Sequence, residues 1–139
     1  MERKLIDVLV VEDQQFDVEL ILRALYIHAP ELTTVVTETG AAAMGFLQTH
    51  SPKVILLDLH LPDMDGCELL RRIRQEPACT KTPVIVLTGS VLDRDRKDAH
   101  GLGINAYISK TSDVAMLAEH LSLFKHLLNR TTTKQAEAS

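Results

Sequence analysis

The sequence predicts an α/β fold, in which five parallel strands form one sheet and five helices cover its two faces. Along the 139 residues, short apolar segments alternate with segments of helical periodicity. The apolar segments are hydrophobic at consecutive positions, which is typical of strands buried on both faces. Strands that alternate with helices pair in parallel through right-handed crossovers. Because the sequence has no internal repeat and no Pro/Gly/Ser linker, we expect one compact domain.

Two strand–helix units begin the chain. Residues 6–11 form an apolar, β-branched run that predicts a buried strand. Residues 15–28 follow with the spacing of a helix, which Pro30 closes. The predicted inward stripe of this helix is Leu20, Ile21, Ala24 and Leu25. Residues 33–38 are β-branched but more polar, so we expect a strand at the sheet edge, followed by a short helix over residues 41–49.

The middle of the chain repeats this pattern twice. Residues 54–57 predict the third strand, and a loop over residues 59–66 leads into a helix over residues 68–75. Residues 84–87 predict the fourth strand. The helix that follows, residues 93–102, is charged on its outer face.

The last unit is a strand over residues 106–109 and a helix over residues 113–128. Five apolar residues of this helix fall on one stripe, namely Val114, Leu117, Leu121, Phe124 and Leu128. Residues 130–139 are polar and lack periodicity, which predicts a disordered C-terminal tail. We therefore assign residues 1–129 to the domain and the remainder to the tail.

The composition excludes several classes of function. The net charge is -4, and no stretch or helix face is rich in Lys and Arg, so a nucleic-acid partner is not expected. No run of about 18 apolar residues occurs, and the N-terminus lacks the pattern of a signal peptide. We therefore expect no membrane segment and a cytoplasmic location. Cys67 and Cys79 lack CxxC spacing, which favours two free thiols over a zinc site or a disulfide.

Polar residues stand directly after four of the five predicted strands. Glu12 and Asp13 follow the first strand, Asp58 the third, Thr88 the fourth and Lys110 the fifth. The carboxyl ends of parallel strands share one edge of the sheet, where ligands of such folds bind. Each of these residues alone has an ordinary explanation as a helix cap or a solvated side chain. Their convergence at one edge indicates a functional site.

Three neighbouring carboxylates repel one another unless a cation compensates their charge. Mg²⁺ suits such a site because it prefers oxygen ligands, keeps several waters and takes only one or two carboxylates directly. We expect Asp13, Asp58 and the backbone carbonyl of His60 to be the direct ligands, with Glu12 acting through a water.

The same residues suit phosphoryl transfer. Asp58 can attack phosphorus and form an aspartyl phosphate. Lys110 would stabilise the charge on the phosphoryl oxygens, and Thr88 would form a hydrogen bond with one of them. Gly89 leaves room for the backbone to approach the phosphate closely.

Four blocks of the sequence resemble the CheY-like receiver domains of two-component signalling. They are VLVVED at 8–13, VILLDLHLPDMDG at 54–66, PVIVLTG at 83–89 and AYISK at 106–110. The likeness runs over residues 6–128 and implies a flavodoxin-like sheet with strand order 2-1-3-4-5.

The resemblance also implies roles for individual residues. Asp58 would be the phosphoacceptor, Glu12 and Asp13 the acidic metal pair, Thr88 the switch hydroxyl, Lys110 the phosphate-contacting lysine and Tyr107 the switch aromatic. The chain departs from the family pattern at two positions. Thr111 replaces the usual proline after Lys110, so we expect this loop to be strained, rearranged or trans. Gly89 stands where alanine is commoner.

By this resemblance the chain would be a single-domain response regulator that takes a phosphoryl group from a histidine kinase or a histidine phosphotransfer protein onto Asp58. Phosphorylation would switch the surface of the fourth helix, fifth strand and fifth helix, which binds an unidentified downstream protein or relays the phosphoryl group. Such a protein catalyses its own phosphorylation and dephosphorylation but is not a conventional enzyme. The stretch VEDQQFDVELILRAL at 11–25 is similar to small regulators paired with phytochrome-type histidine kinases.

Two helices carry more apolar residues than one buried stripe needs. The additional residues of the first helix are Phe16, Val18 and Leu22. They belong either to the core or, as the resemblance implies, to the docking face for the phosphodonor. The additional residues of the last helix are Met116, Leu123 and Leu127. They favour a symmetric homodimer through the fourth helix, fifth strand and fifth helix.

Three other functions fit less well. A phosphatase of the haloacid-dehalogenase group carries a second aspartate two residues after its nucleophile, where this chain has His60. A flavin-binding module needs a Ser/Thr/Gly-rich phosphate loop after the first strand, where this chain has the acidic segment EDQQFD. A degenerate receiver that only binds partners is disfavoured because the acceptor and metal positions are all filled.

Overall fold

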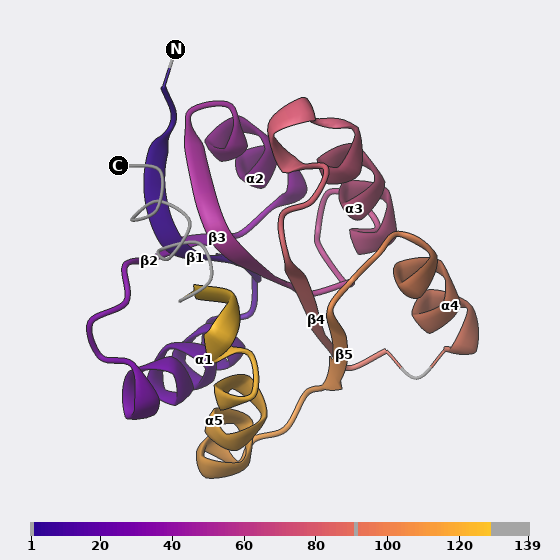
Figure 1. Cartoon of the computed structure of the whole chain (residues 1–139). Coiled ribbons are helices and arrows are strands. Elements are labelled where there is room, and N and C mark those ends of the chain that lie inside the picture. Colours follow the sequence, from indigo (N-terminus) through magenta and orange to yellow (C-terminus); the bar gives the residue numbers. More distant parts are fainter. Residues whose placement is uncertain (1, 91, 129–139) are drawn as a thin grey trace.

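The computed structural model describes residues 2–90 and 92–128 and confirms the predicted α/β fold (Figure 1). Five strands form one sheet in the order β2-β1-β3-β4-β5. The strands are β1 (Lys4–Val11), β2 (Thr34–Thr37), β3 (His50–Leu57), β4 (Val84–Thr88) and β5 (Ala106–Ser109). The helices are α1 (Gln15–His28), α2 (Gly40–Leu47), α3 (Gly66–Gln75), the short 3₁₀ helix η1 (Pro77–Cys79), α4 (Asp93–Gly101) and α5 (Val114–Ser122). Among the described helices, none is long and apolar enough to span a membrane.

Every neighbouring pair of strands is parallel, so all five strands end at the same edge of the sheet. β2 forms one edge of the sheet, as expected. The register of β1 and β3 sets Val11 opposite Leu57. One residue further, the N–H of Asp58 donates to the carbonyl of Val11 at 3.0 Å. The topology alone therefore brings the residue after β1, Glu12, next to Asp58.

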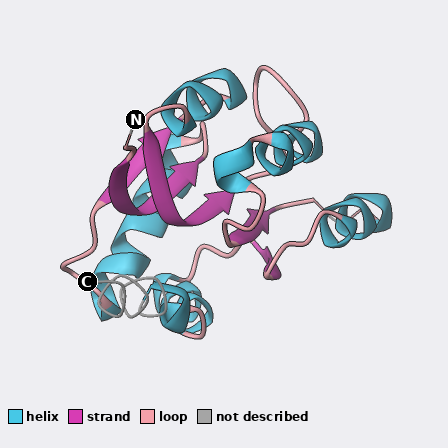
Figure 2. Cartoon of the chain, turned by 45° about the horizontal axis from the view of Figure 1, so that its top comes forward, coloured by secondary structure: helices cyan, strands magenta, loops and turns pink. Residues whose placement is uncertain are grey.

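Helices cover both faces of the sheet, as the two views in Figures 1 and 2 show. α1 and α5 pack against each other on one face, and α2, α3 and α4 cover the other. Strand residues alternate between the two cores: in β1, Val8 and Val10 face α1 and α5, whereas Leu9 and Val11 belong to the opposite core. Because both faces are covered, the strands are hydrophobic at consecutive positions.

The structure confirms that Leu20, Ile21 and Ala24 of α1 are buried, as predicted for its inward stripe. Its buried residues are Val18, Leu20, Ile21 and Ala24. Val18, for which both the core and a docking face were open, lies in the core with 6% of its surface exposed. Phe16 and Leu22 are exposed, at 66% and 38%. Of the three additional apolar residues, two therefore remain available on the surface.

β3 begins earlier than predicted, at His50 rather than at residue 54. β3 is longer because β1 already pairs with it at Lys4, which lies opposite His50. Pro52 is compatible with this part of β3 because β4 pairs with β3 only from Ile55, which leaves the first half of β3 with one neighbouring strand.

The prediction of one continuous helix over residues 113–128 is wrong. α5 ends at Ser122, residues 123–124 form a turn, and residues 125–128 are helical again. The Ser122 hydroxyl donates to the carbonyl of Glu119 at 2.7 Å, and this bond competes with the helical hydrogen bonds.

The break in the last helix changes which residues face the core. Leu127, predicted to lie off the inward stripe, is buried, because the helical phase shifts after the turn. Met116 and Leu123 are exposed, as expected for the second stripe. Residue 129 and the tail predicted for residues 130–139 lie outside the described residues.

Candidate functional site

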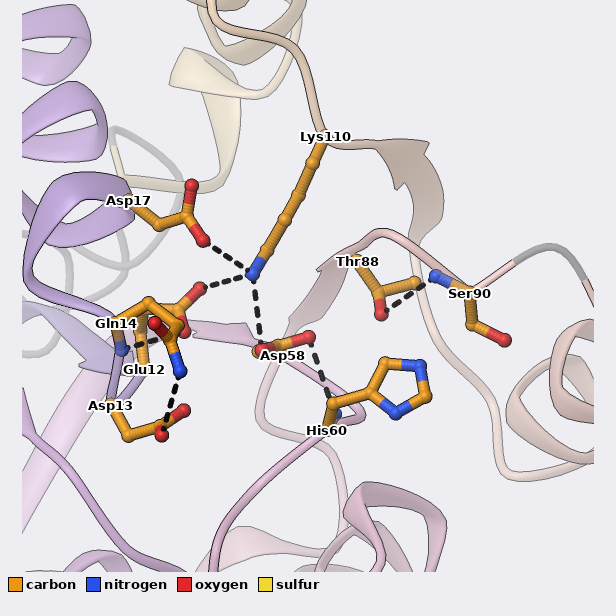
Figure 3. A network of polar contacts seen from close by, with 9 residues as sticks. All are labelled: Glu12, Asp13, Gln14, Asp17, Asp58, His60, Thr88, Ser90 and Lys110. Carbon is orange, nitrogen blue, oxygen red and sulfur yellow. Dashed lines mark hydrogen bonds and ion pairs between the residues drawn. The ribbon is translucent and has the colours of Figure 1, made fainter.

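The acidic residues predicted at the strand ends meet at one edge of the sheet (Figure 3). Glu12 and Asp13 follow β1, and Asp58 follows the neighbouring strand β3. One carboxylate oxygen from each of these residues lies within 4.8 Å of those from the other two. Glu12 and Asp58 are buried, and Asp13 is partly buried. The structure thus brings together the three carboxylates that the sequence indicated as a metal site.

Lys110 follows β5 and extends its ammonium group among these carboxylates (Figure 3). Its Nζ forms ion pairs with Glu12 at 2.8 Å, Asp17 at 2.8 Å and Asp58 at 3.1 Å. The backbone N–H of Lys110 donates to the carbonyl of Thr88 at 2.9 Å, which positions the start of the side chain. Lys110 therefore balances part of the negative charge of the site.

The peptide bond between Lys110 and Thr111 is trans, and no cis peptide bond occurs among the described residues. Because Thr111 replaces the usual proline, this loop was expected to be strained, rearranged or trans, and the structure shows the trans form. The next residues are held by hydrogen bonds, because Thr111 Oγ1 accepts the N–H of Asp113 and the Asp113 carboxylate accepts the N–H of Met116, each at 3.1 Å. The side chain of Lys110 reaches Asp58 from this trans loop.

Asp17 is a residue of the site that sequence reasoning missed. It lies in the first turn of α1, where an acidic side chain has the ordinary explanation of a favourable interaction with the helix dipole. Its position in the sequence could have indicated this role, because α1 begins shortly after the carboxyl end of β1. The first turn of a helix that starts at this edge of a parallel sheet borders the site.

Burial and mutual contacts shift the pKa values of two residues in the site. Burial raises the pKa of Glu12 to about 7; the contact with Lys110 opposes this rise, and the negative charge of Asp58 adds to it. Burial lowers the pKa of Lys110, but its contacts with Asp17 and Glu12 outweigh that effect and raise the pKa above its ordinary value. Lys110 is therefore a cation at neutral pH.

Thr88 and Tyr107 are linked through Ser90. Thr88 is fully buried at the end of β4, and its Oγ1 accepts the N–H of Ser90 at 3.3 Å. The Tyr107 hydroxyl donates to the carbonyl of Ser90 at 3.4 Å, and the guanidinium of Arg96 lies 5.0 Å from the centre of the tyrosine ring. The Ser90 hydroxyl donates to the carboxylate of Asp95 in α4. A movement of Thr88 can therefore reach both Tyr107 and α4 through one residue.

The loop after Asp58 closes on itself and holds His60 beside the carboxylate. The His60 N–H donates to Asp58 Oδ1 at 3.2 Å, while the His60 side chain is exposed. His60 and Asp65 pair in an isolated antiparallel bridge, and the N–H of Gly66 donates to the carbonyl of Leu59 at 2.9 Å. The role of the His60 carbonyl as a metal ligand stays a prediction.

The donor set fits a hard divalent cation. Asp13 Oδ1 is buried and has no hydrogen-bond partner within the part of the chain that the structure describes. A buried carboxylate oxygen without a partner is unfavourable unless a cation contacts it. A solvent-open hollow of about 550 Å³ is lined by Asp13, by the loop at residues 59–65 and, at the start of α4, by Leu92, Arg94 and Asp95. Oxygen ligands beside such an opening suit Mg²⁺ or Mn²⁺.

Comparison with known proteins identifies the family. The family model for the response regulator receiver domain matches residues 8–122. The chain belongs to this family and is a receiver-domain response regulator of two-component signalling. Receiver domains are signalling proteins rather than conventional enzymes, they bind a divalent metal ion, and they accept a phosphoryl group from a histidine kinase.

Individual relatives agree with this assignment. The response regulator Rcp1 of Synechocystis sp. is 35% identical over 114 residues, which cover 77% of this chain and 78% of that protein. The polar-differentiation response regulator DivK of Brucella ovis is 30% identical over 117 residues, which cover 84% and 94%. Among solved structures, the phosphorylated cyanobacterial phytochrome response regulator RcpA has a TM-score of 0.78 at 30% identity, covering 94% of this chain and 96% of that one. The Mn²⁺-bound form of Rcp1 has a TM-score of 0.75 at 32% identity, covering 88% and 91%.

Proposed function

We propose that a histidine kinase or a histidine phosphotransfer protein phosphorylates this chain on Asp58, with Mg²⁺ as the metal ion. The observation that carries this proposal is the contact of Lys110 Nζ with Asp58 at 3.1 Å inside a cluster of three carboxylates. Phosphoryl transfer depends on positioning and on positive charge around the transferred group. The lysine supplies one such charge, and the carboxylates are suited to hold another.

Asp58 is the nucleophile in this proposal. One oxygen of Asp58 forms the new P–O bond while the P–N bond of a phosphohistidine donor breaks, and its electron pair stays on the imidazole nitrogen. The His60 N–H contacts Oδ1 of the acceptor and Lys110 contacts Oδ2, so both oxygens are oriented. Asp13, Asp58 and the His60 carbonyl would hold Mg²⁺, with Glu12 acting through a water, and the bound ion would neutralise charge on the carboxylates and phosphoryl oxygens.

Thr88 and Tyr107 would convert phosphorylation into a change of surface. The Thr88 hydroxyl accepts a hydrogen bond from Ser90, so its own proton remains to be donated to a phosphoryl oxygen. Movement of Thr88 would pass through Ser90 to Tyr107 and to Asp95 of α4. The switched surface would consist of α4, β5 and α5, where a downstream protein or a second copy binds.

The donor would dock on α1, where Phe16 and Leu22 are exposed. The similarity to RcpA, a cyanobacterial phytochrome response regulator, supports a phytochrome-type histidine kinase as this donor. The receiver domain would comprise residues 1–129, and the protein would act in the cytoplasm.

Incubation with acetyl phosphate, with and without Mg²⁺, followed by measurement of the intact mass, tests the proposed phosphorylation. We expect one phosphoryl adduct that requires Mg²⁺ and is absent from the Asp58→Asn variant. Beryllofluoride, which mimics an acyl phosphate without hydrolysing, separates rapid hydrolysis from a failure to react. An adduct on Asp58→Asn would contradict the proposal, and so would the absence of both adduct and beryllofluoride binding in the unchanged protein.

A further inference from the structure

Asp17 makes a contact that phosphoryl transfer to Asp58 does not by itself require. Its Oδ2 lies 2.8 Å from Lys110 Nζ, closer than the Asp58 oxygen at 3.1 Å (Figure 3). The side chains of Lys110 and Asp17 are only 22% and 25% exposed. Solvent and salt weaken such a partly enclosed ion pair less than a pair on the open surface. The contact therefore constrains where the ammonium group lies.

The ammonium group of a lysine needs such a constraint, because it stands at the end of a flexible four-carbon chain. Lys110 carries three N–H donors, and three carboxylates surround it, those of Glu12, Asp17 and Asp58. These carboxylates come from three places in the fold, namely the end of β1, the first turn of α1 and the end of β3. Lys110 donates hydrogen bonds to Asp17 and Asp58 and forms an ion pair with Glu12, so three different elements together fix the position of its ammonium group.

We propose that Asp17 is a positioning residue for phosphoryl transfer, which together with Glu12 holds Lys110 so that its third N–H points at the Asp58 oxygen. This inference rests on the proposed function of Asp58 as the phosphoacceptor. Glu12 and Asp17 keep their contacts during the reaction. Only the third donor changes its partner, from Asp58 Oδ2 to an oxygen of the arriving phosphoryl group. Lys110 is then oriented before the reaction begins, which lowers the entropic part of the barrier.

Two other roles for Asp17 lead to different expectations. If Asp17 competed with the phosphoryl group for Lys110, its removal would accelerate the reaction. The geometry opposes this, because Lys110 has as many N–H donors as carboxylate partners and the arriving group replaces only the contact with Asp58. If Asp17 only stabilised the start of α1 through the helix dipole, its removal would lower Tm but would not change the rate of phosphorylation.

The test compares initial rates of Asp58 phosphorylation by acetyl phosphate at saturating Mg²⁺. The variants are Asp17→Asn and, as the matched control, Glu19→Gln, which removes an exposed carboxylate from the same helix. We expect Asp17→Asn to slow the reaction about tenfold, because Lys110 loses its orientation. Glu19→Gln should react at the rate of the unchanged protein. Asp17→Glu keeps a carboxylate and should recover part of the loss.

A second comparison asks whether Asp17 acts through Lys110. In a Lys110→Met background, Asp17→Asn should cause no further slowing, because the group that Asp17 positions is gone. Thermal unfolding of each variant is recorded alongside, since a structural role would lower Tm whether or not Lys110 is present.

The inference is overturned if Asp17→Asn reacts as fast as Glu19→Gln, or faster than the unchanged protein. Equal slowing by Asp17→Asn with and without Lys110 overturns it as well. Both results leave the proposed function in place, because the unchanged protein still forms the adduct on Asp58. If the unchanged protein forms no adduct and binds no beryllofluoride, the proposed function fails and the inference fails with it.

Discussion

The carboxylate of Asp63 accepts a hydrogen bond from the backbone N–H of Gly40 at 2.8 Å and thereby joins the loop after Asp58 to the start of α2. Its second oxygen accepts the N–H of Ala41 at 3.0 Å. The first N–H groups of a helix have no partner within the helix, so a residue of the neighbouring loop satisfies two of them here. The position of the loop that follows Asp58 therefore depends on α2.

Replacing Asp63 with asparagine is expected to lower stability in a pH-dependent way. The two N–H groups lower the pKa of Asp63, so the folded protein binds this proton less readily than the unfolded chain does. Its contribution is complete above the unfolded pKa of about 3.9 and is lost as the pH falls through the lower folded pKa. The Tm values of the two proteins should differ at neutral pH and converge as the pH falls below about 3.9. A difference that stays constant as the pH falls would contradict this explanation.

Gly66 and Gly89 should respond oppositely to replacement by alanine. A Cβ on Gly66 would lie 2.3 Å from the Cα of Leu59 and 2.8 Å from the carbonyl oxygen of Asp58. Gly66→Ala should therefore cost more than about 2 kcal/mol of unfolding free energy and should slow phosphorylation, because the displaced backbone carries the acceptor. A Cβ on Gly89 would meet nothing within 4 Å. Gly89→Ala should stabilise the fold by about 0.4–1 kcal/mol, since it restricts the unfolded chain.

Urea unfolding measures both glycine variants. A destabilised Gly89→Ala protein would mean that the loop after Thr88 requires glycine. A Gly66→Ala protein of unchanged stability would mean that the loop after Asp58 can shift without loss.

The fold and most of the candidate site could be predicted because both depend on local patterns and on one topological rule. Consecutive apolar positions indicate strands that are covered on both faces, and parallel strands separated by helices must end at one edge. This rule alone brought Glu12, Asp13 and Asp58 together, and the structure confirms that they are neighbours. Their roles in metal binding and phosphorylation stay predictions.

The features that the sequence did not reveal depend on orientation and on single side chains. Whether Asp17 and Val18 face the site, the core or solvent depends on how α1 is rotated on the sheet, and periodicity does not determine that angle to within one residue. The break after Ser122 occurs where the apolar period continues, and at this point the Ser122 hydroxyl bonds the carbonyl of Glu119 and weakens the helix. The spacing of hydrophobic residues predicts neither the rotation of α1 nor the break after Ser122.

Arg74 is expected to be important for stability, because it joins the end of α3 to two loops. Its guanidinium donates to the backbone carbonyls of Cys79 at 3.1 Å, Thr82 at 2.7 Å, Leu102 at 2.9 Å and Gly103 at 3.1 Å. Arg74→Met should lower the unfolding free energy by about 2–4 kcal/mol, since these carbonyls lose a charged partner. Arg74→Lys should recover little, because an ammonium group lacks the planar fork of donors.

Arg71→Met in the same helix is the matched control for Arg74. Arg71 is exposed and forms an ion pair with Glu68 at 3.1 Å, which should contribute little to stability because solvent screens it. Urea unfolding compares the two variants. Equal losses would show that the four carbonyl contacts of Arg74 contribute no more than a surface ion pair.

The exposed edge at β5 and α5 is expected to pair with a second copy in the phosphorylated state. β5 has one neighbouring strand, β4, and beside it lies a hollow of about 510 Å³, lined by residues 107–111 and by Met116, His120, Leu123 and Phe124. Leu123 is 70% exposed and Met116 48% exposed. A symmetric interface would remove this apolar surface from water, which favours association.

Size-exclusion chromatography with light scattering, with and without beryllofluoride and Mg²⁺, measures this association. We expect a dimer only with beryllofluoride, and a monomer for Leu123→Glu under both conditions. Since Leu123 is exposed, its replacement should leave Tm within a few degrees of the original, as surface substitutions usually do. Leu5→Glu changes a residue of similar exposure, 57%, at the start of β1 and should not affect dimer formation. A monomer in both states would exclude the dimer. The exposed apolar residues of α5 would then remain uncovered, so a different protein could still bind the surface formed by α4, β5 and α5.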